Sequence, residues 1–368
     1  MGEQSRRIAV ALAVAVAVVV ATVSLSSVAA GAWPAPRGDG FIRVCGTQLC
    51  LQGRPFVIHG ASAYGQYADP VQEVALARRA HLDVIELVEF DTQYHVLSDT
   101  MSAATWDRLD CFIAVAGAAG LHVVLNLSEY GQSLAAAGQP PTAVDWESYL
   151  RFIADRINTV TGVRYADDPA IAMVELYGEI DAPDFGVPTA GTTAQMTAYF
   201  HRSLAEWHAL APNILASTGG FSYINYPDSQ SGIDWQQIVS DPLDTVCDVE
   251  VNSSADRDVS VPELSSYCRG LGKPWFLAAW SSCYNDQPWG SADIDDWPSD
   301  TAMAAHAEDM EEIAADRDVT PPGPAMAPVG TDFWNLGDTP VVEGTCDLGP
   351  QFPLTFDVVR RAGAGLAG

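Results

Sequence analysis

Acidic, amide and aromatic side chains follow most of the apolar, strand-like segments of this chain. They are Tyr64, Glu89, Glu129, Glu179, Asn252, Trp280 and Trp334. Carboxylates in such places can move protons in general acid–base catalysis, and aromatic rings can stack on the apolar face of a ligand. These residues form a site only if the fold brings the ends of their segments together.

Strand-like and helix-like segments alternate along most of the chain. The strand candidates are 55–62, 82–90, 121–130, 170–177, 213–220, 247–254, 274–280 and 331–338. The helix candidates are 70–80, 105–119, 145–160, 193–210, 234–239, 262–271, 301–316 and 352–362, several of which begin with a capping residue such as Thr105, Asp145 or Thr193. Eight apolar strands alternating with amphipathic helices predict an α/β fold, a closed (β/α)8 TIM barrel, preceded by a β-hairpin at 41–56.

An open, doubly wound sheet is the alternative fold, although no glycine-rich phosphate loop follows the first strand. In a barrel, functional side chains lie at the carboxyl ends of the strands. The seven residues named above would then converge at one end of the molecule.

The first 32 residues have the pattern of an export signal. Two arginines precede an apolar run from residue 8 to about residue 25, and small residues at 30–32 fit a cleavage site. We therefore expect a secreted mature protein of residues 33–368 that forms one domain. The apolar run is also long enough to serve as an uncleaved membrane anchor.

The chain is strongly acidic, with a formal net charge of -29, and Lys273 is its single lysine. Such a surface repels nucleic acid and anionic membranes, so a neutral ligand suits it better than an acidic polysaccharide. No apolar stretch after residue 32 approaches the length of a membrane span. We expect a monomer outside the membrane.

All 7 cysteines lie beyond the expected cleavage site, where disulfides can persist. Cys45 and Cys50 flank a short turn and are close enough to staple the hairpin, and Cys111 is the candidate for a free thiol. Spacing alone does not fix the other pairs, for which Cys247 with Cys268 and Cys283 with Cys346 are hypotheses. The histidines and cysteines show no metal-ligand spacing, and no GxSxG motif follows a strand, so we expect no metal, no cofactor and no serine hydrolase chemistry.

Five segments resemble glycoside hydrolase family 5, and within it the secreted endo-β-1,4-mannanases. They are 41–65 (FIRVCGTQLCLQGRPFVIHGASAYG), 105–127 (TWDRLDCFIAVAGAAGLHVVLNL), 168–181 (DPAIAMVELYGEID), 270–280 (GLGKPWFLAAW) and 332–338 (DFWNLGD). The resemblance implies a barrel whose floor is plugged by the hairpin, and a neutral β-linked polysaccharide as substrate. It makes Glu179 the acid/base and Trp334 the platform beneath the sugar, with Trp280 and Tyr64 extending that surface.

The chain departs from the family pattern at the second catalytic carboxylate. The family uses two carboxylates about 5 to 5.5 Å apart, one as nucleophile and one as proton donor. Ala279 stands where the nucleophilic glutamate is expected, and Gly178 replaces the asparagine before the acid/base. Glu86 aligns with the family's strand-2 arginine and Asn252 approximately with its strand-6 histidine.

These departures leave three hypotheses. In the first, the protein binds a mannan or glucan but its chemistry is impaired or altered. In the second, it is a working hydrolase in which Glu86 fills the space vacated at 279, or in which Glu250, Glu89 or Glu129 activates water. In the third, it is a cell-surface interaction protein without catalysis.

Overall fold

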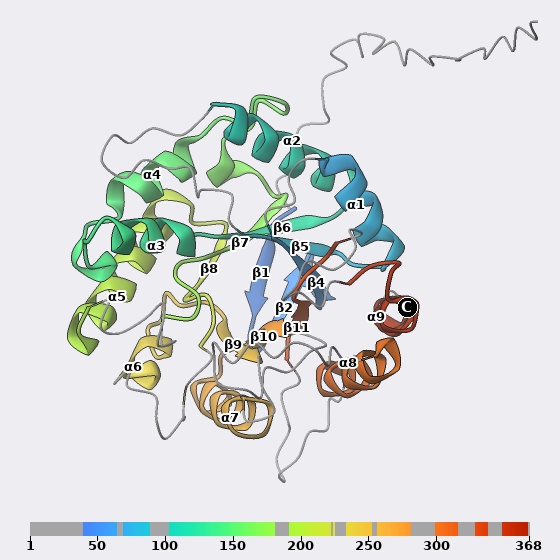
Figure 1. The fold of residues 1–368 in the computed structure, drawn as a ribbon. Helices are drawn as coiled ribbons and strands as arrows, with labels where there is room; N and C mark the ends of the chain where they lie inside the picture. The colour runs from blue at the N-terminus through green and yellow to red at the C-terminus, as the bar shows by residue number, and fades with distance from the viewer. Residues whose placement is uncertain are drawn as a thin grey trace, which may run out of the picture. The chain divides into compact units, whose positions relative to one another are not determined.

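Eight parallel strands form the wall of a barrel in this computed structural model, which confirms the predicted fold class (Figure 1). The strands are β4 (Ile58–Tyr64), β5 (Val84–Val88), β6 (His122–Asn126), β7 (Ile171–Glu175), β8 (Leu215–Ser217), β9 (Cys247–Val251), β10 (Trp275–Trp280) and β11 (Gly330–Phe333). Their order is β8-β7-β6-β5-β4-β11-β10-β9. A parallel bridge between Phe221 and Val249 joins the two ends of this order and closes the wall.

The structure describes residues 40–64, 69–88, 103–180, 191–221, 224, 233–251, 256–280, 299–315, 328–337 and 348–366. The expected export signal and the cleavage site lie outside these residues. None of the helices in the described ranges is long and apolar enough to cross a membrane.

Helices surround the strands and cover their outer faces (Figure 1). They are α1 (Pro70–Arg79), α2 (Ala103–Ala119), α3 (Ser128–Ala136), α4 (Glu147–Asp155), α5 (Thr193–Leu210), α6 (Trp235–Val239), α7 (Val261–Leu271), α8 (Asp300–Ala315) and α9 (Pro353–Leu366). Short 3-10 turns lie at Pro141–Ala143 and Tyr165–Asp167, and a π-helical turn at Asp256–Ser260 leads into α7. The strands are buried on both faces, which explains why they read as continuous apolar runs.

The expected bounds of one helix and one strand are wrong. Helix α4 ends at Asp155, because the chain turns into a bridge between Ile157 and Arg164 instead of continuing to residue 160. Helix α3 begins at Ser128, inside the segment 121–130 expected as strand, because the Asn126 side chain accepts a hydrogen bond from the Ser128 amide at 3.0 Å.

The capping residues of α5 and α4 differ from the expected Thr193 and Asp145. Thr192, one residue before the expected Thr193, caps α5 through a capping box with Gln195. Asp145 accepts a hydrogen bond from the Glu147 amide, although Trp146 occupies the cap position of α4.

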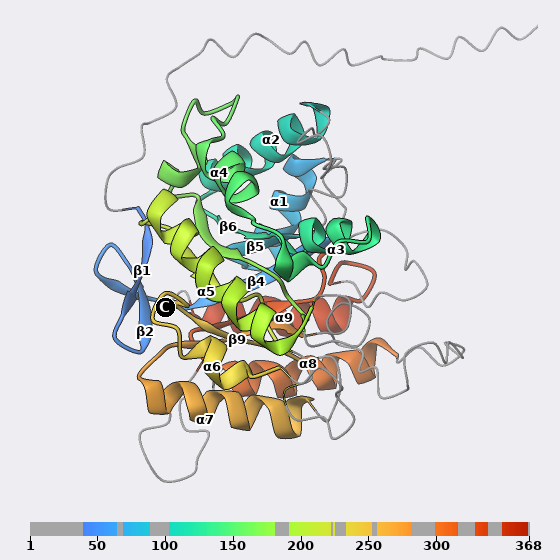
Figure 2. The same cartoon turned by 90° about the vertical axis from the view of Figure 1, so that its left-hand side faces the viewer.

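The N-terminal hairpin belongs to a three-stranded antiparallel sheet of β1 (Ile42–Cys45), β2 (Gln48–Leu51) and β3 (Arg54–Phe56), which lies against the barrel (Figure 2). Ile42 and Leu49 are buried in one cluster with Val84, Met173 and Phe276 from the barrel strands. The hairpin thus covers apolar side chains of the barrel interior. The predicted disulfide between Cys45 and Cys50 is present.

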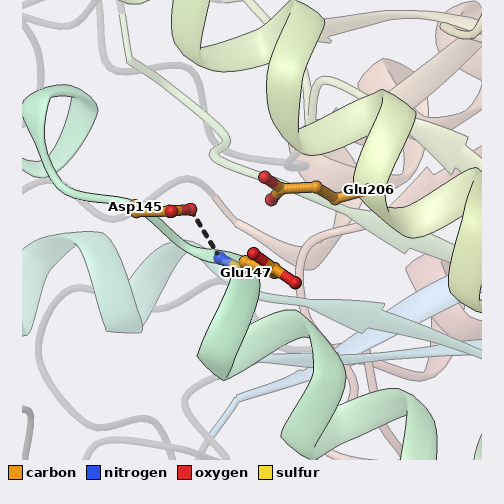
Figure 3. A group of neighbouring side chains, drawn as sticks. All are labelled: Asp145, Glu147 and Glu206. Atoms are coloured by element: carbon orange, nitrogen blue, oxygen red, sulfur yellow. Dashed lines mark hydrogen bonds between the residues drawn. The ribbon is translucent and has the colours of Figure 1, made fainter.

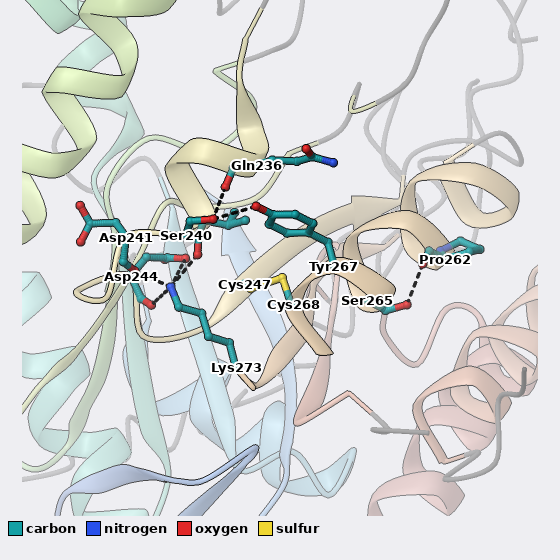
Figure 4. Close-up of a disulfide and its surroundings, with 11 residues drawn as sticks. Gln236, Ser240, Asp241, Asp244, Cys247, Pro262, Ser265, Tyr267, Cys268 and Lys273 are labelled. Atoms are coloured by element: carbon teal, nitrogen blue, oxygen red, sulfur yellow. Dashed lines mark hydrogen bonds and ion pairs between the residues drawn. A yellow bond between two sulfur atoms is a disulfide. The ribbon is translucent and has the colours of Figure 1, made fainter. Parts of the chain in front are cut away.

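A second disulfide, Cys247 to Cys268, ties the start of β9 to α7, as the sequence hypothesis proposed (Figure 4). Beside it, the Lys273 ammonium donates to the carbonyl oxygens of Val239, Asp241 and Asp244, and so fixes the loop that leads into β9. Among the described cysteines, Cys111 is the free one, as predicted. The hypothetical pair Cys283 and Cys346 lies outside the described residues.

Candidate active site

Glu179 lies in the turn that follows β7 and is half-buried. Its backbone has φ +54°, a left-handed conformation that costs a non-glycine residue about 1–2 kcal/mol. Hydrogen bonds hold this turn in place: the Glu179 amide donates to the Gly220 carbonyl at 3.1 Å, the Tyr177 amide to the Thr218 carbonyl at 2.8 Å, and the Gly178 amide to Ser128 Oγ at 2.8 Å. The predicted acid is therefore fixed by contacts with the neighbouring strand ends.

Ala279 faces the barrel interior because β10 contains a bulge. Leu277 pairs with Val249 of β9, but Ala279 pairs with Glu250, so β10 advances by two residues where β9 advances by one. The bulge places Ala279 and Glu250 side by side on the interior face, while Trp280 pairs with Val251 on the outer face.

Trp280 is fully buried in the outer layer. Its ring meets Phe333 edge-on with a centroid distance of 4.8 Å, lies near His306 of α8, and donates through Nε1 to Thr331 Oγ1. A sugar cannot stack on a ring in this position, so the expectation that Trp280 extends a sugar-binding surface has no support here.

Glu250 lies against the glycines that end β7 and β8. A Cβ atom added at Gly178 would lie 3.2 Å from Glu250 Oε1, and one added at Gly220 would lie 2.9 Å from the same oxygen and 2.7 Å from Cγ. The Glu250 carboxylate is thus next to the residue that precedes Glu179, and only glycine leaves room for it at position 220.

A chain of polar side chains runs around the barrel interior from β11 to β7. Ser62 Oγ donates to Glu86 Oε2 at 2.5 Å and lies 2.8 Å from Asp332 Oδ2, and Asn126 Nδ2 lies 2.8 Å from Glu86 Oε1 and 3.2 Å from Glu175 Oε2. Glu86, proposed from the sequence as a relocated catalytic carboxylate, is 5% exposed, and both of its oxygens accept hydrogen bonds from this chain. Glu175 is 2% exposed and is held as an interior acid by this chain.

The remaining candidates are described to different extents. Glu129, in the first turn of α3, is 4% exposed. Trp334 is half-buried just after β11, and its amide donates to the Trp280 carbonyl at 2.8 Å. Tyr64 is the last residue of β4 and pairs with Val88, but its side chain lies outside the described part, as do Glu89 and Asn252.

Sequence reasoning missed the polar partners of these acids, namely Ser62, Asn126 and Asp332. Each is a polar residue at an inward position of a barrel strand, and this pattern was the sequence signal that could have identified them. Their partners could be inferred only from the strand register that brings Ser62 opposite Glu86, and that register is a property of the folded barrel.

Several of these carboxyl groups favour their protonated form. Burial raises the pKa of Asp248 to about 7 against a hydrogen bond from the Gly219 amide, and burial raises the pKa of Asp83 to about 6. Burial, followed by the nearby charges of Glu86 and Asp248, raises the pKa of Glu175. The folded chain therefore keeps protons on these carboxyl groups that the unfolded chain would release near pH 4.

We expect the free energy of unfolding to fall as the pH rises from about 4 to about 7, because the folded state binds more protons in that window. Each unit of raised pKa corresponds to about 1.4 kcal/mol at the upper end of the window. Urea denaturation at a series of pH values measures this slope. His122, whose pKa is lowered by burial, acts in the opposite direction below about pH 6.5.

The matched variant for this prediction is Asp248→Asn. It removes one carboxyl group with a raised pKa and keeps the contribution of His122 to the pH dependence of stability. Its stability should depend less on pH than that of the unmodified protein. An equal slope in both proteins would show that Asp248 is not the group that takes up the proton.

One group of three acidic side chains in the described ranges, Asp145, Glu147 and Glu206, brings carboxylate oxygens within 4.8 Å of one another (Figure 3). Asp145 and Glu147 are exposed, and Asp145 already accepts a hydrogen bond from the Glu147 amide. Glu147 also forms an ion pair with Arg151 at 2.6 Å. These contacts account for the two exposed acids as helix-end and ion-pair partners, without an ion.

The fold is that of barrel glycosidases. An endo-1,4-β-mannanase from Rhizomucor miehei superposes with a TM-score of 0.68 at 18% identity, covering 88% of this chain and 99% of that one. An endoglucanase catalytic domain from Thermobifida fusca superposes with a TM-score of 0.52 at 17% identity, covering 89% and 98%. At these identities the likeness concerns the fold.

In sequence, the chain is similar to plant mannan endo-1,4-β-mannosidases. Enzyme 8 from Oryza sativa subsp. japonica is 28% identical over 230 residues, which are 52% of this chain and 62% of that protein. Enzyme 7 from Arabidopsis thaliana is 27% identical over 193 residues, which are 43% and 44%. The chain spans about half the length of the curated relatives it matches, and no protein-family model matches it. The resemblance to glycoside hydrolase family 5 mannanases and cellulases is thus confirmed.

Proposed function

We propose that this protein binds a neutral β-linked polysaccharide of the mannan or glucan type at the carboxyl ends of its barrel strands, with chemistry altered from the family pattern. The observation that carries the proposal is the pair of positions 179 and 279. A glutamate is held in the turn after β7, whereas Ala279 stands where the resemblance implies the family's nucleophile. An alanine cannot attack an anomeric carbon, so double displacement through residue 279 is excluded.

The polysaccharide class follows from similarity and charge. The relatives named above are mannan mannosidases, and the structural neighbours include a mannanase and an endoglucanase. A net charge of -29 disfavours an acidic polysaccharide. We propose Trp334 as the sugar platform, with Tyr64, Asn252 and Glu129 as further contacts, and residues 1–32 as an export signal that makes the protein extracellular.

A hydrolase with a relocated second carboxylate is the second candidate function. The position of Glu250 supports this candidate. Glu250 pairs directly with Ala279, so its carboxylate lies on the neighbouring strand at the same height in the barrel as the alanine that stands in the family's nucleophile position. Glu86 is the other described candidate, although its two oxygens are engaged by Ser62 and Asn126.

Affinity gel electrophoresis in β-mannan and in soluble β-glucans tests the binding function. We expect at least one neutral glycan to retard the protein, polygalacturonate to have no effect, and Trp334→Ala to weaken the retardation, since a stacked aromatic ring contributes about 1 kcal/mol. A protein that migrates unchanged in every neutral β-glycan would contradict the proposed function.

A further inference from the structure

Two positions that depart from the family pattern lie beside one glutamate. Ala279 stands where the resemblance implies a glutamate and Gly178 where it implies an asparagine, and Glu250 lies beside both. A side chain at 178 would begin 2.5 Å from the Gly219 carbonyl oxygen and 3.2 Å from Glu250 Oε1. The space that an asparagine would need is therefore used by the Gly219 backbone and the Glu250 carboxylate.

The neighbouring strand end repeats this arrangement. Gly219 and Gly220 have φ +105° and +94°, conformations that suit glycine; Gly219 lies against the backbone of Gly178, and Gly220 lies against the Glu250 side chain. The Gly220 carbonyl also accepts the hydrogen bond from the Glu179 amide. One glycine thus contacts both carboxylate-bearing residues, which places them at the same edge of the barrel.

Fewer strands separate Glu250 from β7, the strand that leads to Glu179, than separate residue 279 from it. Between β7 and β10 the wall contains β8 and β9, whereas between β7 and β9 it contains β8 alone. Paired carboxylates at short separation are the arrangement of retaining glycosidases, in which one carboxylate is the nucleophile.

We propose that Glu250 is the catalytic nucleophile of this protein and that Glu179 is its acid/base; the inference rests on the proposed glycan-binding function. A Glu250 carboxylate oxygen bonds to the anomeric carbon as the glycosidic C–O bond breaks. Its electron pair passes to the leaving oxygen, which takes the proton of Glu179. Water then attacks the glycosyl ester, gives a proton back to Glu179, and releases Glu250 and a sugar with retained β configuration.

Reducing-end release from β-mannan and β-glucans by the full chain is the first measurement. We expect Glu250→Gln and Glu250→Gly to lower the rate more than about 10³-fold, because removing a covalent nucleophile removes the double-displacement route. Glu73→Gln is the matched control, since Glu73 is also buried but lies on α1 outside the barrel interior, and the rate of this variant should be unchanged. Thermal unfolding of each variant checks that the fold is retained.

Two further readouts separate a nucleophile from a residue that only supports the structure. An activated 2-deoxy-2-fluoro-β-mannoside, or its glucose counterpart, should form a stable ester that peptide mass spectrometry locates on Glu250. Azide added to Glu250→Gly should restore turnover with a glycosyl azide as product. Proton NMR of the first product should show the β-anomer.

Each contrary result has a distinct meaning. An ester on Glu86, an α-anomeric first product, or an active Glu250→Gly variant would overturn the inference. Release of no sugar by the unmodified protein would also overturn it, while glycan retention in the affinity gel would leave the proposed binding function intact. Absence of retention would overturn the proposed function itself.

Discussion

Glu179→Gln should lower reducing-end release about 10²–10⁴-fold, the usual contribution of a general acid. Glutamine has nearly the same shape but no acidic proton for the leaving oxygen, so binding in the affinity gel should be unchanged. The backbone turn at 178–180 should persist, because its hydrogen bonds run through amides and the hydroxyl of Ser128. The kinetic loss would then report chemistry alone.

The leaving group sharpens this test. The dinitrophenolate of a dinitrophenyl glycoside leaves without being protonated. On this substrate the Glu179→Gln variant should therefore regain most of the lost rate of the glycosylation step. A Glu250 variant should not regain it. Equal losses on polysaccharide and on dinitrophenyl glycoside would contradict the assignment of Glu179 as the acid. Glu73→Gln again serves as the reference for an unrelated buried glutamate.

Asp110→Ala should lower the free energy of unfolding by about 3–5 kcal/mol, the cost of breaking a buried ion pair on one side. Asp110 of α2 is fully buried, and its carboxylate accepts two hydrogen bonds from Arg156 at 2.9 and 2.6 Å. It also accepts bonds from Thr159 and from the Tyr165 hydroxyl. The variant would leave the Arg156 guanidinium without its main partner and would release the loop after α4 from α2.

Asp107→Ala is the matched control for this prediction. Asp107 lies 3.9 Å from the same guanidinium but is 63% exposed, so its loss should cost less than about 1 kcal/mol. Burial raises the pKa of Asp110, but the hydrogen bonds from Arg156, Thr159 and Tyr165 lower it by more. The pKa of Asp110 therefore lies below its usual value. The stabilisation should therefore be present above about pH 4 and be lost as the pH falls below it. Similar urea midpoints for the two variants would contradict the prediction.

The barrel could be predicted because its strands are buried on both faces and leave a strong apolar signal. The start of α3 was missed for a local reason: Ser128 and Tyr130 continue the apolar pattern of β6, and the turn into the helix is set by the Asn126 side chain. The site residues remain predictions from the sequence, and the partners of Glu86 and Glu175 could not be named because they depend on the strand register.

Trp280 shows the limit of strand periodicity. With regular alternation, Ala279 and Trp280 would occupy opposite faces, but which of them faces the interior depends on the bulge after Leu277. A bulge adds one residue to a strand without a distinctive sequence, so the outward position of Trp280 could not be predicted from the sequence. The same bulge gives Glu250 its position beside Ala279, and for this reason Glu250 was only one of several candidates from sequence.

The disulfide between Cys247 and Cys268 has a mechanical consequence. It converts the chain between these residues, 21 positions apart, into a covalent ring that contains β9 and most of α7. Force applied to the two ends of the protein passes through the sulfur–sulfur bond and does not reach the residues inside the ring. The strand that bears Glu250 is therefore shielded from tension while the bond is intact, and reduction would expose it to the full load.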